Sequence, residues 1–233
     1  KRENKFKLIS SFAMFYDIDD PNGFCKDISS LLEKDGIWIL EMSYFPMLLS
    51  NLTYDQICHE HVTYYTLSVF KKIVEKNGLK IIDFSFNVIN GGSIEIICAK
   101  KNSKVKVQKN KIYNQLLIEK KISAKDYKKF NLRVDNTKKT TNLLLENIFK
   151  AKQKIIGYGA STKGNIVLNH CNIKSKQIKY ICDENPEKYG RYTPGTNIKI
   201  ISKKKMKNIK PDYLLVLIWS FKTEVIKQEL NYI

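Results

Sequence analysis

A histidine–glutamate–histidine triplet at residues 59–61 carries the side chains best suited to acid/base chemistry. It follows the sequence YDQIC at residues 54–58 and precedes the pair Tyr64-Tyr65. Imidazole is the one side chain whose unperturbed pKa lies near neutral pH, so the triplet can exchange protons there. Carboxylate, phenol and amide groups around it supply hydrogen-bond partners. We therefore interpret the triplet as an acid/base site.

Two other interpretations of the triplet remain open, a metal site and a purely structural polar loop. A zinc site needs a third and usually a fourth ligand, commonly from Cys or His. The remaining histidine, His170, lies in a distant segment, and the sequence contains no Cys-x-x-Cys pair. We therefore expect no metal at the triplet, and the structural loop is the stronger alternative.

Length and composition indicate a soluble globular protein. The chain has 233 residues, enough for two modest domains, with 43% hydrophobic and 11% aromatic residues. No apolar run approaches the roughly 20 residues of a bilayer span, so we expect no membrane partner and a cytoplasmic location. The scattered, odd set of cysteines suits reduced thiols: Cys25, Cys58, Cys98, Cys171 and Cys182.

A net charge of +18 raises the question of nucleic-acid binding. Only Arg2, Arg133 and Arg191 are arginines, so lysine supplies nearly all of the positive charge. Recognition of phosphate and base edges usually recruits the planar arginine fork. We therefore expect no nucleic-acid partner, with such binding kept as a minor alternative. The charge favours anionic substrates such as nucleotide diphosphates.

The first half of the chain has the pattern of an α/β domain. Pro21 is placed to open a helix, and the elements alternate strand, helix, strand, helix, then an antiparallel pair. The expected elements are a buried strand over 8–15, a helix over 21–32, a central strand of a parallel sheet over 37–41, a helix over 66–77, and strands over 79–86 and 93–99 joined by a turn at 90–92.

This order predicts the second half of a doubly wound α/β domain. The triplet follows the carboxyl end of a strand, where ligands of such sheets bind. No glycine-rich turn precedes Leu8, so we interpret the chain as a fragment that begins part-way through its first domain. We place that partial domain at 1–108, a helical connection at 109–150 and a second, smaller α/β domain at 151–233.

The second domain opens on a glycine turn, Gly157-x-Gly159-x-x-x-x-Gly164, between a strand and a helix. Backbone amides of such a turn, with Lys163 beside it, can hold a phosphate. The spacing differs from Gly-x-Gly-x-x-Gly, so a tight connection without a ligand is the alternative. Asp183, after the next strand, could hold a ribose hydroxyl of NAD. A buried strand over 213–220 and a helix over 223–230 follow, whereas the lysine runs at 100–111 and 203–210 indicate linkers or helix faces.

Taken together, these segments resemble the class I S-adenosylmethionine-dependent C-methyltransferases that act on nucleotide-linked 4-keto-deoxysugars. The matching pieces span nearly the whole chain and are specific in their joint order: residues 54–61 with Tyr64-Tyr65, Gly91-Gly92-Ser93, 157–165, 183–196 and 211–219. The resemblance implies a partial methyltransferase domain followed by a Rossmann-like domain that binds the sugar nucleotide. It also implies that the main cofactor-binding motif, and any zinc-binding module, lie upstream of Lys1.

The resemblance also implies roles for residues. His61 would remove the acidic proton next to the ketone, and the resulting carbanion would attack the methyl group of S-adenosylmethionine. Glu60 would fix the imidazole or contact the sugar, and His59 and Tyr64 would hydrogen-bond the ketone oxygen. The implied substrate-binding residues are Tyr64, Gly91, Gly92, Ser93, Gly159, Ala160, Lys163, Gly164, Asn165, Asn185 and Lys188.

The chain departs from the family pattern at a few positions. The family tends to carry tyrosine where Cys58 stands and often histidine where Asp17 stands. The segment Pro194-Gly195-Thr196 usually continues with His and Pro, but here Asn197 and Ile198 follow. Two other functions remain open: an NAD-dependent nucleotide-sugar oxidoreductase, and a non-catalytic fragment that binds a sugar nucleotide. By the resemblance, the expected partner is the nucleotide-sugar substrate.

Overall fold

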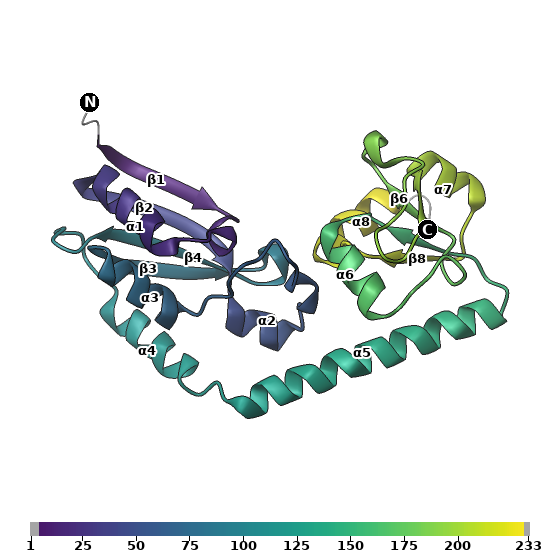
Figure 1. Cartoon of the computed structure of the whole chain (residues 1–233), viewed down its shortest axis with the longest axis horizontal. Helices are drawn as coiled ribbons and strands as arrows, with labels where there is room; N and C mark the ends of the chain where they lie inside the picture. The colour runs from purple at the N-terminus through teal and green to yellow at the C-terminus, as the bar shows by residue number, and fades with distance from the viewer. Residues whose placement is uncertain (1–4, 231–233) are drawn as a thin grey trace. The chain divides into compact units, whose positions relative to one another are not determined.

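The computed structural model describes residues 5–230 of the chain, which form two compact units (Figure 1). The first unit contains residues up to Tyr54 together with His59–Phe130, and the second contains Asp55–Cys58 together with the residues from Asn131 onward. The boundary therefore falls within one long helix and also within the segment that leads into the triplet. None of the helices among the described residues is both long and apolar enough to cross a membrane.

The first unit is built on a four-stranded sheet in the order β1-β2-β4-β3. Its strands are β1 (Phe6–Phe12), β2 (Leu32–Ser43), β3 (Leu79–Asn87) and β4 (Ser93–Lys100). β1 and β2 are parallel, whereas β4 runs antiparallel to both β2 and β3. The predicted antiparallel pair at the sheet edge is confirmed. β2 is central, as expected, but the prediction of a parallel sheet on both of its sides was wrong.

The helices of this unit begin where their sequence signals predict. Pro21 lies in the first turn of α1, and Asp20 caps this helix through a 2.9 Å hydrogen bond from Gly23 N to Asp20 Oδ1. Thr66 caps α3 by accepting from Val69 N. The helices that belong wholly to the first unit are α1 (Pro21–Leu31), α2 (Phe45–Asn51), α3 (Leu67–Lys76) and α4 (Lys109–Glu119).

The core of the first unit lies between the sheet and its helices. Trp38, Leu40 and Met42 of β2 are fully buried against residues of α1 and α3. Because side chains alternate along a strand, these three residues share one face of the sheet. Figure 1 shows α1 and α3 along that face, so the first unit has one layer of helices packed on one layer of strands.

The expectation that β1 is buried was wrong. Leu8 is 56% exposed and Phe12 is 54% exposed. β1 pairs only with β2 among the described strands, and its alternation sends Ile9 toward the helices and Leu8 and Phe12 to the opposite face. The apolar run therefore predicted a strand correctly, but it did not predict that one face of this strand is exposed to solvent.

The second unit contains a four-stranded parallel sheet in the order β7-β6-β5-β8. Its strands are β5 (Ile155–Tyr158), β6 (Tyr180–Asp183), β7 (Lys199–Ser202) and β8 (Tyr213–Val216). Its shorter helices are α6 (Thr162–His170), α7 (Lys203–Ile209) and α8 (Lys222–Glu229). The long helix α5 (Ala124–Lys150) precedes β5, and with α4 it makes up most of the segment over 109–150.

Two features of the second unit differ from the prediction. The strand expected over 213–220 ends at Val216, is only partly buried, and is followed by a 3-10 turn, η5 (Trp219–Phe221). Strand β7 was not predicted. The lysine run at 203–210 was assigned to a linker or a helix face, and it forms helix α7. In fact Met206 anchors α7 in a core cluster with Val225 of α8.

Candidate functional site

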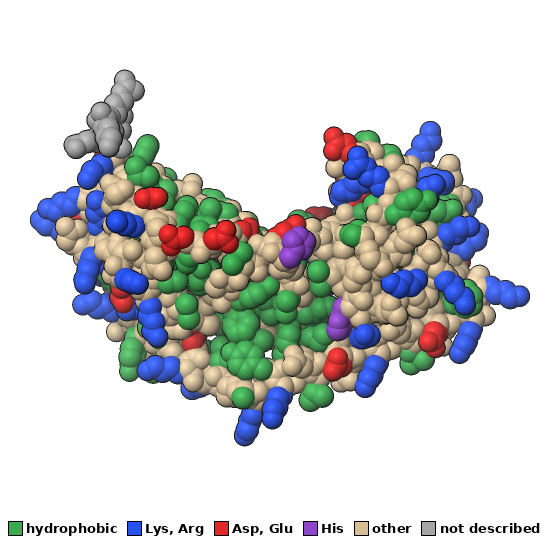
Figure 2. All heavy atoms as spheres, in the orientation of Figure 1, with side chains coloured by type: hydrophobic (Ala, Val, Ile, Leu, Met, Phe, Trp, Pro, Cys, Tyr) green, Lys and Arg blue, Asp and Glu red, His purple; other side chains and the backbone are tan. Residues whose placement is uncertain are grey.

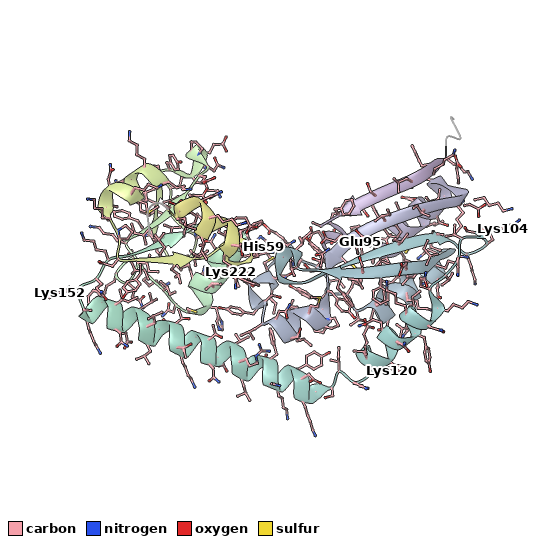
Figure 3. The ribbon with its side chains drawn as sticks, turned by 180° about the vertical axis from the view of Figure 1, so that it is seen from behind. His59, Glu95, Lys104, Lys120, Lys152 and Lys222 are labelled. Carbon is pink, nitrogen blue, oxygen red and sulfur yellow. The ribbon has the colours of Figure 1, made fainter. Side chains whose placement is uncertain are left out.

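The triplet lies at the carboxyl end of the parallel pair β1 and β2. It follows β2 after α2 and the short 3-10 turn η2 (Tyr54–Gln56), and it precedes α3. Figure 3 shows His59 near the end of the first sheet where β1 and β2 finish, with Lys104 at the opposite end. The predicted loop position is confirmed, although the connection contains the unpredicted helix α2.

His61 is the half-buried member of the triplet and packs on Tyr16. The centroid of its ring is 4.4 Å from that of Tyr16, with the two rings inclined by 46°. The backbone N–H groups of Val62 and Thr63 both donate to the carbonyl of Tyr16, at 2.9 and 3.1 Å. The ring of Tyr64 lies 6.2 Å from His61. The imidazole is therefore held at the carboxyl end of β1 and β2. Its ring packs on Tyr16, and the two residues after it bond the backbone of Tyr16.

Asp17 lies next to this imidazole. Burial raises the pKa of Asp17, nearby His61 lowers it and Glu60 raises it, with a net increase. An adjacent carboxylate favours the charged form of an imidazole. Sequence reasoning treated Asp17 as part of a turn and as a departure from a family pattern, and it missed Tyr16. The only sequence signal for either residue was its place at the carboxyl end of a strand.

His59 and Glu60 are both exposed, in contrast to His61. Their side chains therefore face the space outside the loop. This distribution leaves His61 as the member of the triplet with the most structured surroundings, which suits a group that must present one nitrogen to a substrate.

Glu119, a buried carboxylate at the end of α4, binds the start of α3, which follows the loop. Its Oε1 accepts from Tyr44 OH at 2.5 Å and from Leu67 N at 2.6 Å, and its Oε2 accepts from Ser68 N at 2.8 Å. Gln115 Nε2 adds a 2.8 Å hydrogen bond to the same phenol. Glu119 therefore satisfies donors in the first turn of α3, a role that no local sequence pattern indicates.

Gly91, Gly92 and Ser93 form the turn between β3 and β4. Gly92 has φ of +138°, and a Cβ there would lie 2.8 Å from Met47 Cβ in α2. Asn51 Nδ2 donates to Gly91 O at 2.8 Å, and the fully buried Ser93 donates to Ile89 O at 3.0 Å. Packing against α2 is therefore sufficient to explain the glycine at 92, without a substrate.

In the second unit, residues 55–58 lie beside the glycine turn. Asp55 is 3% exposed, and Trp219 Nε1 donates to its Oδ2 at 2.8 Å. Burial lowers the pKa of Lys163, whereas the neighbouring Asp55 and Cys58 raise it. Lys163, predicted to neutralise a phosphate, therefore already has a carboxylate near its ammonium group.

Asp183 binds the backbone of the glycine turn and of the segment after β6. The carboxylate of Asp183 accepts from Ala160 N at 2.8 Å, from Lys188 Nζ at 3.2 Å and from Asn185 N at 2.9 Å. Gly159 has φ of +90°, and a Cβ there would lie 2.6 Å from Ile218. The groups that would hold the pyrophosphate and ribose of a dinucleotide are thus bonded to one another, which argues against the oxidoreductase alternative.

The other predicted residues of this region serve the start of α6 and the turn after β6. Ser161 caps α6 by accepting from Gly164 N at 3.0 Å. Asn165 has a buried carboxamide oxygen without a hydrogen-bond partner among the described residues. Asn185 accepts from Glu187 N at 3.0 Å, and Lys188 Nζ also donates to Ala160 O at 3.0 Å.

A cavity of about 430 Å³ opens beside this turn, at the carboxyl ends of β5 and β6. Its lining includes Ser161, Asp183, Glu184, Lys188, Lys203 and Phe221. Lys203 bonds Glu184 at 2.8 Å and the fully buried Glu229 at 2.7 Å, so its charge is balanced. Within residues 5–230, no group of three or more His, Cys, Asp or Glu side chains is arranged to hold a metal ion.

Lysine and arginine side chains are dispersed over the visible surface of each unit (Figure 2). On the face drawn they are interrupted by acidic and apolar side chains and do not gather into one stripe.

Two family models match the chain. The model for the C-methyltransferase C-terminal domain matches residues 88–233, and a model for a methyltransferase domain matches residues 1–83. The C-methyltransferase NovU of Streptomyces niveus is 28% identical over 236 residues, which cover 100% of this chain and 56% of that protein. The chain thus spans little more than half the length of this relative.

Solved structures show a weaker likeness. The putative methyltransferase of Haloferax volcanii, in complex with the activator Trm112, gives a TM-score of 0.37 at 12% identity, covering 42% of this chain and 55% of that one. The magnesium protoporphyrin IX methyltransferase of Synechocystis PCC 6803, with bound SAH, gives 0.35 at 12% identity, covering 42% and 46%.

Proposed function

The chain belongs to the C-methyltransferase C-terminal domain family, and we propose that it is part of an S-adenosylmethionine-dependent enzyme that methylates a nucleotide-linked 4-keto-deoxysugar at the carbon next to the ketone. The observation that carries the proposal is the half-buried imidazole of His61 at the carboxyl end of β1 and β2, held against Tyr16. The 28% identity to a C-methyltransferase over the whole chain supports the reaction class.

His61 acts as the base in this proposal. A proton on carbon next to a ketone is acidic because its loss gives an enolate, and a neutral imidazole can accept it near neutral pH. The contact with Tyr16 and the hydrogen bonds of Val62 and Thr63 restrict the ring, so less ordering is needed when substrate arrives. Tyr64 and His59, on the same loop, hydrogen-bond the oxygen on which charge develops.

S-adenosylmethionine supplies an electrophilic methyl group on a positively charged sulfur. One feature of the first unit fits a cationic donor. Glu41, near the carboxyl end of β2, is 7% exposed, and its Oε1 is buried without a hydrogen-bond partner among the described residues. A buried carboxylate without a partner is costly, and a cation or a hydroxyl group of the donor would satisfy it. We assign Glu41 as the residue of this chain that faces the donor.

The second unit binds the sugar nucleotide in this proposal. The cavity beside the glycine turn contains carboxylates that accept from hydroxyl groups and the exposed ring of Phe221, on which a base can stack. Its lysines are already bonded to carboxylates, so the cavity suits an uncharged, hydroxyl-rich part of the ligand better than the diphosphate.

The test uses the complete protein with a nucleotide-linked 4-keto-deoxysugar. We expect methyl transfer from labelled S-adenosylmethionine and, without that donor, exchange of the proton next to the ketone with deuterium from the solvent. His61→Ala should abolish both reactions because the base is lost, while affinity for the sugar nucleotide, measured by calorimetry, changes by no more than a few fold.

The matched control is His170→Ala, which removes the histidine at the end of α6. This variant should retain both reactions. Equal deuterium exchange by His61→Ala and by the unmodified protein would remove His61 from the mechanism. Sugar-nucleotide binding by a complete protein that never transfers a methyl group would contradict the proposed reaction and support a non-catalytic binding protein.

A further inference from the structure

Tyr44, the first residue after β2, joins two segments of the candidate site. Its backbone N–H donates to Gly92 O at 3.3 Å, in the turn between β3 and β4. Tyr44 also forms a parallel β-bridge with Tyr65, near the end of the triplet loop (residues 59–66). The next residue, Phe45, donates its N–H to Tyr65 O at 3.0 Å. The position of Tyr44 therefore sets the spacing between that turn and the end of the triplet loop.

The side chain of Tyr44 is bound by two residues of α4. The buried phenol donates to Glu119 Oε1 at 2.5 Å and accepts from Gln115 Nε2 at 2.8 Å. The carboxylate of Glu119 also accepts from Leu67 N and Ser68 N, the first two residues of α3. A buried carboxylate is costly unless donors surround it, and hydrogen bonds to a charged group are strong. One carboxylate thus binds both the residue after β2 and the residues after the triplet loop.

The contacts of Tyr65 lead back to His61 through one short turn, η1 (Phe15–Asp17). Tyr65 is buried, and the centroid of its ring lies 5.2 Å from that of Phe15. The next residue, Tyr16, is the one on which His61 packs, and its carbonyl accepts from the two residues after His61. A displacement of Tyr65 would therefore also displace the turn that holds His61.

We propose that Tyr44 and Glu119 position the triplet loop and thereby restrict His61. Both are positioning residues, because they act through the backbone of other residues and touch no reacting atom. All of the residues involved belong to the first unit. Without these hydrogen bonds the loop would have more conformations, which must be lost again before reaction. The catalytic part of this inference rests on the proposed function, whereas the mobility of the loop can be measured without any substrate.

Four variants of the complete protein test the proposal by amide hydrogen exchange and by kinetics. Tyr44→Phe removes only the hydroxyl group, Glu119→Gln retains one acceptor oxygen, and Glu119→Ala removes both oxygens. The matched control is Asp35→Ala, because Asp35 Oδ1 also accepts from a hydroxyl group, that of Ser103, and from a backbone N–H, that of Lys104, both at 2.9 Å. Lys104 lies at the end of the first sheet opposite to the triplet (Figure 3).

We expect amide exchange, resolved to single residues, to accelerate about tenfold at the two α3 amides that bind Glu119 when this residue is changed to alanine. The two amides that bond Tyr16 O should accelerate about threefold, because the turn that holds them loosens together with Tyr65. Glu119→Gln and Tyr44→Phe should have smaller effects in the same direction. Adding Tyr44→Phe to Glu119→Ala should change little further, since both substitutions break the same hydrogen bond.

The kinetic comparison separates positioning from a general loss of stability. In Glu119→Ala, kcat should fall about tenfold with KM within threefold, as expected for a loss of orientation. Glu119→Gln should recover part of kcat, because one acceptor oxygen remains. Asp35→Ala should leave kcat and the exchange of the triplet loop unchanged, although it removes a comparable set of hydrogen bonds.

Unchanged exchange of the two amides that bond Tyr16 O would overturn the proposal, because the effect of Glu119 would then end at α3. Acceleration of the same size in Asp35→Ala would also overturn it. Glu119→Gln and Tyr44→Phe decide the question if Glu119→Ala does not fold. Faster exchange with an unchanged kcat would refute the catalytic part. A complete protein that transfers no methyl group would refute the proposed function alone, and the exchange comparison would still decide for or against the positioning.

Discussion

The ring of Tyr16 lies 4.4 Å from the imidazole of His61, and the next residue along the chain, Asp17, lies within electrostatic reach of that imidazole. One turn after β1 thus supplies both a packing surface and a negative charge to the proposed base. A base must be uncharged to accept a proton, so the charge of Asp17 bears directly on the pH at which His61 can work.

We predict that Asp17→Asn extends activity to lower pH. Removing the carboxylate disfavours the imidazolium form, so His61 should lose its proton at a lower pH. The acid limb of the kcat/KM profile should therefore move to lower pH. The His61 signal in an NMR titration should move with it.

The control for this prediction is Asp19→Asn, which removes an exposed carboxylate two positions further on. It should leave the pH profile of kcat/KM and the NMR titration curve of His61 unchanged. An acid limb that moves to higher pH in Asp17→Asn would show that Asp17 does not stabilise the charged imidazole.

Much of the order of elements, though not α2 or β7, was predictable from the sequence because the signals involved are local. Pro21 and Asp20 define the start of α1, Thr66 the start of α3, and Asn90 to Gly92 the turn between β3 and β4. These patterns depend on neighbours within a few residues, as does the α/β alternation.

The pairing and burial of these elements were not predictable in the same way. The sequence could not show that Leu8 and Phe12 face an uncovered side of the sheet, nor that β4 inserts antiparallel beside β2. Asp55 and Trp219 are 164 positions apart, and no local pattern connects them. The triplet was found from its residue types, whereas the contact of His61 with Tyr16 is seen only in the three-dimensional structure.

We predict that Gly92→Ala destabilises the first unit by about 2–3 kcal/mol, because a residue with a Cβ is strained at φ of +138° and would also collide with Met47. Urea denaturation measures the change. Gly190→Ala is the control, since its φ is +80° but nothing lies within 4 Å of the added Cβ. It should cost about 1 kcal/mol through strain alone. Equal costs at both positions would show that the contact with α2 is unimportant.

We predict that Glu119→Ala lowers the stability of the first unit by about 3 kcal/mol, because Leu67 N, Ser68 N and Tyr44 OH lose a buried acceptor. Glu119→Gln keeps one acceptor oxygen and should lose about half as much. The comparison is Thr66→Ala, which removes only the side-chain cap of α3 and should cost about 1 kcal/mol. Chemical denaturation distinguishes the three variants. If Glu119→Ala lowers the free energy of unfolding no more than Thr66→Ala does, then Glu119 is not an important acceptor for these three donors.

The last prediction concerns Glu229, which is fully buried in the second unit and accepts from Tyr158 OH at 2.9 Å and from Lys203 Nζ at 2.7 Å. Burial raises the pKa of Glu229, but hydrogen bonds from Lys203, Tyr158 and Lys207 lower it overall, below its ordinary 4.5. A depressed pKa means that this carboxylate stabilises the fold above about pH 4.5. That stabilisation is lost as the pH falls through the folded-state value.

Glu229→Gln should therefore cost about 3 kcal/mol at pH 7, because it leaves the charge of Lys203 without its buried partner. The difference from the unmodified protein, followed by urea denaturation between pH 7 and pH 3, should shrink steadily below pH 4.5, as the native carboxylate is itself protonated. Glu224→Gln, an exposed change on the same helix, should show no such trend. A pH-independent difference would mean that Glu229 contributes through packing alone, and that the lysines of α7 are held by something other than its charge.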